Sequence, residues 1–66
     1  MTNNLRVLRA IANISQADLA IEVGVSRQTI NAIESAKYAP STILALKLAR
    51  FFATCVHEIF SLEDDD

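Results

Sequence analysis

The stretch from Gln16 to Ser35, QADLAIEVGVSRQTINAIES, constrains the fold more than any other part of the chain. Gly24, the only glycine, separates two segments with helical apolar spacing, and glycine adopts a positive φ without a Cβ penalty. Ala20 is small enough to let two helices approach each other. The inward-facing anchors are expected to be Leu19, Val23, Val25, Ile30 and Ile33. The pattern predicts two short helices that meet at a sharp corner, whereas a plain helical hairpin would not need these residue types together.

Capping signals extend this prediction to an all-α fold of five helices. Ser15 followed by Asp18 is a capping-box arrangement, and Ser26 and Ser41 are suited to the starts of the third and fourth helices. Thr54 is the best chemical candidate to cap the fifth helix. The five helices are expected at about residues 5–12, 16–23, 27–35, 42–52 and 55–60. No alternating apolar and polar stretch is long enough to predict a strand.

A chain of 66 residues forms one domain with a thin core, because a domain of this length buries only about 60% of the surface that its unfolded chain exposes. The single cysteine, Cys55, excludes an internal disulfide, and no Cys/His cluster suggests a metal or cofactor. With 52% hydrophobic residues, the chain suits compact helical packing against a second copy. We therefore expect a homodimer of a domain at residues 1–62, followed by an acidic tail at residues 63–66.

The net charge of −2 argues at first against a polyanionic partner, because phosphate binding depends on Lys and Arg. The charge is unevenly distributed, since four of the eight acidic residues lie in the tail at residues 63–66. Residues 1–62 carry six basic and four acidic residues, a net charge of +2. The tail is most simply a solvated, frayed end, and the alternative is a tuning role in which it repels non-specific DNA or approaches another basic surface.

Other functional classes are disfavoured by what the sequence lacks. There is no signal peptide and no apolar run near the roughly 18 residues of a membrane span, so we expect a cytoplasmic protein. No catalytic Ser/His/acid or Cys/His set, phosphate-binding glycine loop or metal-ligand spacing points to an enzyme, and no small-molecule ligand is evident. His57 reads as a surface side chain and Cys55 as a small packing residue.

The chain resembles the Cro/C1-type (Xre) helix-turn-helix family through the segments ISQADLA, VGVSRQTINAIE and KYAPS, in a layout that covers nearly all 66 residues. Within that family it is similar to short dimeric repressors such as the cytolysin repressor. The resemblance implies a lambda-repressor-like domain of five helices whose third helix enters the major groove of double-stranded DNA. It implies a transcriptional regulator whose partners are a DNA operator and a second copy of the chain. No cofactor is expected.

The third helix supplies the residues expected to contact bases. With Ile30 and Ile33 facing inward, the outward positions have the chemistry of base readout, since Arg pairs with guanine, Gln or Asn with adenine, and Ala touches the thymine methyl group. The base-contacting candidates are Arg27, Gln28, Asn31 and Ala32. An ordinary polar helix face is the alternative.

Other residues are expected to contact DNA phosphates. Gln16 matches a family position that grips the backbone at a helix N-terminus, and Lys37 and Tyr38 follow the third helix as a second clamp. Tyr38 reads equally well as a half-buried packing residue. The full set of phosphate candidates is Gln16, Thr29, Ser35, Lys37 and Tyr38.

Two further groups of residues have expected structural roles. Arg9 and Glu34 match a family ion pair that joins the first helix to the third, and an Arg fork suits a partly buried carboxylate. The fourth helix has more apolar surface than one core can cover, so we expect its dimer interface to include Ile43, Leu44 and Phe51. The alternative is an antitoxin-type module in which exposed Ile43 and Leu44 bind a toxin partner.

Three positions depart from the family pattern. Ala36, Ala53 and Cys55 stand where relatives often carry Gly, Asn or a good cap. An alanine forced into the left-handed region costs on the order of 1 kcal/mol. Asn13, by contrast, suits the left-handed end of the first helix.

Overall fold

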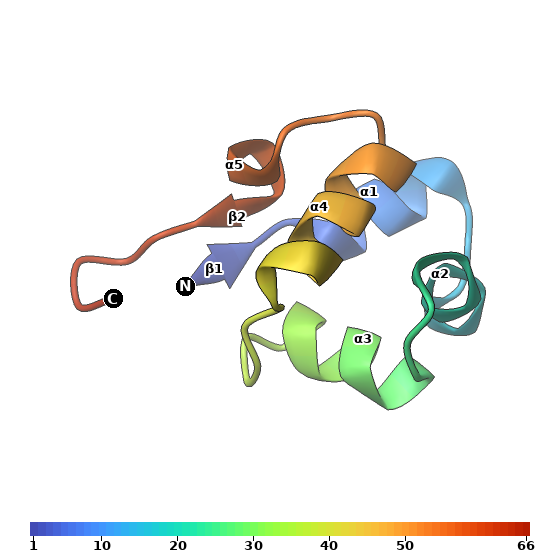
Figure 1. The fold of residues 1–66 in the computed structure, drawn as a ribbon, viewed down its shortest axis with the longest axis horizontal. Helices are drawn as coiled ribbons and strands as arrows, with labels where there is room; N and C mark the ends of the chain where they lie inside the picture. Colours follow the sequence, from blue (N-terminus) through green and yellow to red (C-terminus); the bar gives the residue numbers. More distant parts are fainter.

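The computed structural model describes residues 1–66 and contains five helices with one two-stranded sheet (Figure 1). The helices lie close to their expected positions, which confirms the five-helix, mostly helical fold. Their bounds are α1 Leu5–Ala12, α2 Gln16–Val23, α3 Arg27–Glu34, α4 Thr42–Phe51 and α5 Val56–Ile59. None of these helices combines the length and the apolar character needed to cross a membrane.

Three predicted N-caps are present. Ser15 Oγ accepts from Asp18 N at 3.0 Å, and the Asp18 carboxylate accepts in return from Ser15 N, which completes the capping box. Ser26 Oγ accepts from the backbone of Thr29 at 3.2 Å. At the start of α4, Ser41 Oγ accepts from the backbone N–H of Leu44 at 3.1 Å. These bonds satisfy donors that a helix start leaves free.

The prediction that Thr54 caps α5 is wrong. Cys55 occupies the N-cap position and makes no side-chain capping bond. Thr54 instead belongs to the end of α4, because its backbone N–H donates to Ala49 O at 2.9 Å across a residue, Ala53, with φ of 53°. This hydrogen bond is typical of a left-handed helix end. Thr54 therefore completes the end of α4 and does not cap α5.

A short sheet, not expected from the sequence, joins the two ends of the chain. Strand β1, Thr2–Asn3, pairs antiparallel with β2, Phe60–Ser61, in the register Thr2 with Ser61 and Asn3 with Phe60. The strands lie side by side at the edge of the helical body in Figure 1. Two-residue strands carry no detectable alternation, so sequence pattern could not reveal them.

The core is a single cluster to which all five helices contribute. The expected anchors on α2 and α3 are buried, and Val25 packs partly against them. The largest fully buried side chains are Leu5, Leu19, Ile30, Ile33, Leu48 and Ile59. Burying an aliphatic side chain of this size contributes about 1.5–3 kcal/mol. The packing therefore fixes α3 by its inner face and leaves its other face free.

Left-handed residues end the helices where the sequence indicated. Gly24 has φ of 74° and Asn13 has φ of 57°. Ala36 and Ala53 adopt φ of 61° and 53° although neither is glycine or asparagine. Left-handed backbone therefore occurs at two of the three positions that depart from the family pattern.

The exposed surface of α4 differs from the prediction in one residue. Leu44 is only 6% exposed and belongs to the core, so the expectation that it is an exposed interface residue is wrong. Ile43 and Leu46 are 69% and 57% exposed, and Phe51 is also exposed. Leu44 turns inward because it lies four residues before Leu48, which is fully buried on the same helix face.

Candidate nucleic-acid interface

Helix α3 presents a polar outer face opposite its buried one. Arg27, Gln28 and Asn31 are exposed, and Ala32 is half-buried, whereas Ile30 and Ile33 are fully buried. The helix lies along one edge of the domain in Figure 1, with α2 packed beside it. All four expected base-contacting residues therefore share one short helix whose position is set from behind by the core.

The side chain of Glu34 joins three elements near the end of α3. It is 0% exposed, and Arg9 donates to it from Nε at 2.7 Å and from Nη2 at 3.2 Å. Arg6 Nε adds a longer contact at 3.4 Å. The expected partners Arg9 and Glu34 are thus in direct contact as a two-bond fork.

The charge state of Glu34 follows from these bonds. Burial alone raises the pKa of the Glu34 carboxyl, but hydrogen bonds from Arg9 and Gln16 outweigh it and hold the pKa below its usual value. The bond to Glu34 likewise raises the pKa of Arg9. Arg9 Nη1 also donates to Ile14 O at 3.0 Å, which ties the α1–α2 loop to the same ion pair.

The side chain of Gln16, the first residue of α2, turns toward α3 and does not point freely into solvent. Its Nε2 donates to Glu34 Oε1 at 3.0 Å and to Asn31 Oδ1 at 3.4 Å. The side chain is half-buried, and it borders the polar face at Asn31. This residue, which the sequence predicts to contact a phosphate, therefore also connects α2 to α3.

Residues beyond the end of α3 form an exposed loop. Ala36 N donates to Ile33 O and Lys37 N donates to Ala32 O, both at 3.0 Å, which is the bonding of a left-handed helix end. Lys37 therefore follows the helix directly, and its side chain is exposed. Tyr38 is 51% exposed, so neither of its two expected roles is excluded by burial.

The two hydroxyl candidates are engaged locally. Thr29 Oγ1 lies 3.0 Å from Ser26 Oγ in the first turn of α3. Ser35 Oγ donates to Asn31 O at 3.0 Å or to Ala32 O at 3.2 Å, at the last turn. Either hydroxyl can donate in the pair of Ser26 and Thr29, whereas donation from Ser35 to a phosphate would require its hydroxyl to rotate away from the helix carbonyls.

Comparison with known proteins identifies the same region. Residues 5–55 match the family model described as helix-turn-helix. A protein of Methanocaldococcus jannaschii that is 53% identical over 66 residues, with both chains fully covered, is called an uncharacterized HTH-type transcriptional regulator. The Bacillus subtilis protein YgzD bears the same description and is 42% identical over 66 residues, again with both chains fully covered. A third relative with this description, from Archaeoglobus fulgidus, is 39% identical over 66 residues that cover all of this chain and 94% of its own.

The chain belongs to the Cro/C1-type helix-turn-helix family. Its helix-turn-helix consists of α2, the turn at Gly24 and α3. The matched region includes α1 and α4, which pack around these two helices. The names of the relatives describe regulators of transcription, in agreement with the sequence-based expectation that this protein is not an enzyme.

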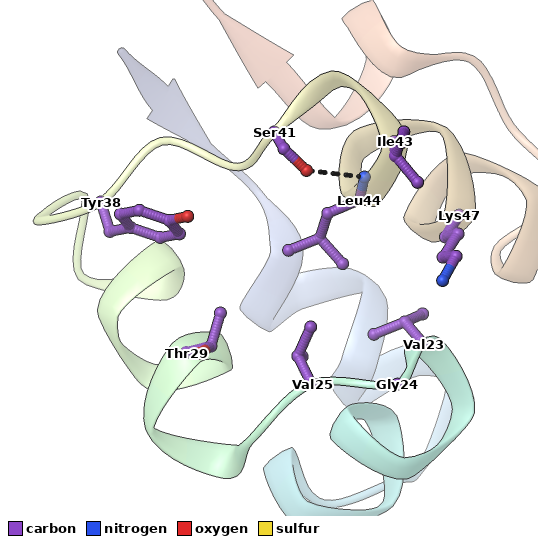
Figure 2. A pocket seen from close by; sticks show the side chains of 9 residues that line it. All are labelled: Val23, Gly24, Val25, Thr29, Tyr38, Ser41, Ile43, Leu44 and Lys47. Carbon is purple, nitrogen blue, oxygen red and sulfur yellow. Dashed lines mark hydrogen bonds between the residues drawn. The ribbon is translucent and has the colours of Figure 1, made fainter.

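A cavity of about 260 Å³ adjoins the helix-turn-helix (Figure 2). Leu44 and Val25 point into its centre, Thr29 and Tyr38 lie on one side, and Lys47 lies on the other. A Cβ at Gly24 would lie 4.0 Å from Lys47 Nζ, so this ammonium group approaches the C-terminal end of α2. A positive charge is favourable at that end of a helix, and sequence reasoning did not single out Lys47 for this role.

Sequence reasoning also missed a contact at the C-terminal end of α3. Asn3 Nδ2 donates to Ile33 O at 2.8 Å, and Asn3 Oδ1 accepts from Leu5 N at 3.1 Å. The bond to Ile33 gives one of the last carbonyl groups of α3 a side-chain donor from β1. No local pattern signals this contact, because the two residues are 30 positions apart in the sequence.

The acidic tail lies against the start of the chain, whereas a frayed end was the simpler expectation. The Met1 amine lies 3.0 Å from Glu63 Oε1 and 2.8 Å from Asp66 Oδ2. The hydrogen bonds that the amine donates to these carboxylates raise its pKa, the bond to Asp66 having the larger effect. A hydrogen bond from the Glu63 backbone, together with the amine, lowers the pKa of Asp66.

Proposed function

We propose that this protein is a repressor that binds an inverted-repeat DNA operator as a homodimer, with α3 of each subunit in the major groove. The observation that carries the proposal is the free polar face of α3, held by a buried core behind it and by Glu34 at its end. Because the core and Glu34 hold α3 in place, the side chains on its free face keep one orientation. In helix-turn-helix proteins the second helix of the motif lies in the major groove of DNA, and α3 is that helix here, which supports DNA as the partner.

The base-reading role rests on Arg27, Gln28, Asn31 and Ala32. Arg27 and Gln28 lie in the first turn of α3, the end of a recognition helix that contacts base edges in this class of motif. Bidentate bonds from Arg to guanine, or from Gln or Asn to adenine, discriminate by about 1–3 kcal/mol each. Asn31 has one partner already, Gln16, so its pairing with a base would redirect that side chain.

The phosphate contacts flank this face. Lys37 and Tyr38 are both exposed just after α3, and the Lys37 ammonium has no ion-pair partner in the structure. Gln16 and Thr29 lie in the first turns of α2 and α3, where a helix start leaves backbone N–H groups without partners inside the helix, and Ser35 is the C-cap residue of α3. Contacts of this kind position the protein on DNA without reading its sequence.

Dimerisation rests on the apolar surface of α4. Ile43, Leu46 and Phe51 are exposed in the single chain, and the small core favours burial of further apolar surface. Leu46 replaces the buried Leu44 in the interface that we propose. A two-fold dimer places two recognition helices in successive major grooves, about 34 Å apart on one face of B-DNA.

A repressor acts by occupancy. A dimer bound to an operator that overlaps a promoter excludes RNA polymerase, and this mechanism needs no catalytic site or cofactor. The protein would perform it in the cytoplasm, where the chromosome is accessible.

Selection of bound sites from random double-stranded DNA tests the proposed function. We expect an enriched inverted repeat whose half-site centres are roughly one helical turn apart. Gel-shift titration with the selected duplex and a scrambled duplex then measures the preference. Absence of any enriched sequence would contradict operator recognition, and a single unrepeated site would contradict the dimer.

A further inference from the structure

The acidic tail and the loop after α3 border the same small cavity. Its volume is about 140 Å³, and it is lined by Met1, Asn3, Ala36, Lys37, Tyr38, Ala39 and Asp66. Asp66 is the only acidic residue in this lining, and Lys37 is the only basic side chain. Asp66 comes from the C-terminal tail and Lys37 from the loop after α3, and no ion pair of 4.0 Å or less joins them.

Three contacts hold Asp66 at this place. The Met1 amine lies 2.8 Å from Asp66 Oδ2, and the same oxygen accepts from Glu63 N at 2.8 Å. Asp66 N donates to Glu63 O at 3.0 Å, which closes the tail into a turn. The β1–β2 pairing brings both chain ends to this side of the domain (Figure 1).

The cavity that Asp66 and Lys37 both border is small. A volume of about 140 Å³ holds only a few water molecules. The Debye length at physiological ionic strength is about 8 Å, so two charges on the rim of one small cavity are only partly screened from each other by salt. A DNA phosphate that approaches Lys37 would therefore meet the field of a carboxylate on the same rim.

We propose that Asp66 competes with DNA phosphate for Lys37 and thereby sets how tightly the protein holds DNA. This inference rests on the proposed role of Lys37 as a phosphate contact. In free protein the carboxylate partly offsets the positive potential at the clamp. In complex, the same carboxylate repels the phosphate or must move away, and both effects weaken binding to every DNA sequence.

Two single substitutions separate this local effect from general charge. Asp66→Asn and Asp64→Asn each remove one negative charge from the same tail, but only Asp66 lines the cavity. We expect Asp66→Asn to tighten binding about two- to fivefold at low salt, the size of a unit-charge interaction across a partly solvated gap. Asp64→Asn should change it clearly less, and the difference between the two variants should shrink as salt is added.

A third variant tests whether Lys37 receives the effect. In a Lys37→Gln background, Asp66→Asn should tighten binding no more than Asp64→Asn does. Binding is measured by fluorescence anisotropy with the selected operator and a scrambled duplex, on protein without tags at either end. Thermal unfolding of each variant verifies that the fold is retained.

The outcomes are distinct from those of the proposed function. Wild-type protein that does not prefer the selected operator would contradict the proposed function itself. Operator binding with equal effects of Asp66→Asn and Asp64→Asn would overturn only the competition, and so would an Asp66→Asn effect that persists without Lys37.

Discussion

Gln16 on α2 donates a hydrogen bond from Nε2 to Oε1 of Glu34 on α3, at 3.0 Å. Arg9 on α1 holds the other oxygen of the same carboxylate at 2.7 Å. One buried acceptor therefore connects both helices of the helix-turn-helix to the helix before them. The orientation of α3 depends on polar contacts as well as on its apolar face.

Removal of this acceptor should destabilise the domain strongly. Glu34→Ala leaves Arg9 without its partner, and breaking a buried pair in this way costs about 3 kcal/mol. Glu22→Ala is the matched control, because Glu22 is exposed on α2 and forms no ion pair. Urea unfolding measures both. A loss for Glu34→Ala that is no larger than the control would remove the bracing role of the pair.

The same carboxylate should make stability depend on pH. The pKa of Glu34 is lower in the folded protein than its unfolded value of about 4.3, so its stabilisation is present above that value. The stabilisation is lost as the pH falls through the folded pKa. The difference in free energy of unfolding between wild type and Glu34→Gln should therefore shrink between about pH 5 and pH 2. Asp66, whose pKa is also lowered, is common to both proteins and cancels. A constant difference across this range would contradict the assignment.

Base and phosphate contacts should fail in different ways. Gln28→Ala should weaken operator binding by about 1–3 kcal/mol and relax the preference at one base position. Lys37→Ala should weaken all sequences alike and reduce the dependence on salt by about one released counterion. Titrations of operator and scrambled duplexes at several salt concentrations distinguish the two. Equal losses on both duplexes for Gln28→Ala would exclude base reading.

The strained alanine after α3 offers a stability test. Ala36 has φ of 61°, so Ala36→Gly relieves a cost of about 1 kcal/mol, of which the freer unfolded chain cancels part. Ala10→Gly in the exposed interior of α1 should instead destabilise by about 1 kcal/mol. Thermal unfolding of the two variants should show changes of different size, with only the second clearly lowering the melting temperature. Equal destabilisation would mean that the left-handed geometry carries no strain.

The proposed dimer can be tested without disturbing the core. Leu46→Glu places a charge on the exposed face of α4 and should produce folded monomers, because an unpaired charge resists burial in an interface. Ile11 on α1 is also exposed, so Ile11→Glu introduces a similar charge outside the proposed interface and should leave the dimer intact. Leu44→Glu is unsuitable, since it would bury a charge in the core. Sedimentation equilibrium decides, and a Leu46→Glu variant that remains fully dimeric would refute the interface.

Local chemistry was sufficient to predict much of this fold. The N-caps at Ser15, Ser26 and Ser41 and the left-handed turn at Gly24 depend on neighbouring residues, so short-range spacing reveals them. Thr54 was misassigned because the end of α4 and the start of α5 compete for the same few residues. Only the three-dimensional path of the chain determines which helix uses it.

Contacts between segments far apart in the sequence could be predicted only in part. The pair of Arg9 and Glu34 was expected from the family resemblance, because no local pattern links residues so far apart. The bond from Asn3 to Ile33 and the position of Asp66 near Lys37 depend on where the chain ends meet. The expectation that Leu44 is exposed was wrong for another reason. When a helix is apolar on most sides, its sequence does not indicate which side packs against the core.

The short β1–β2 ladder has a consequence for the order in which the molecule folds. Its partners are separated by nearly the whole chain, so forming it requires closure of the longest loop available, whereas the corner of α2 and α3 is local. The ladder should close late and open first. The amide of Asn4, which donates to Ile59 O at 3.0 Å, should then exchange its hydrogen faster than the amide of Leu19 within α2. Each such opening would release the bond from Asn3 to Ile33, so the C-terminal end of α3 should loosen with the chain termini before the core unfolds.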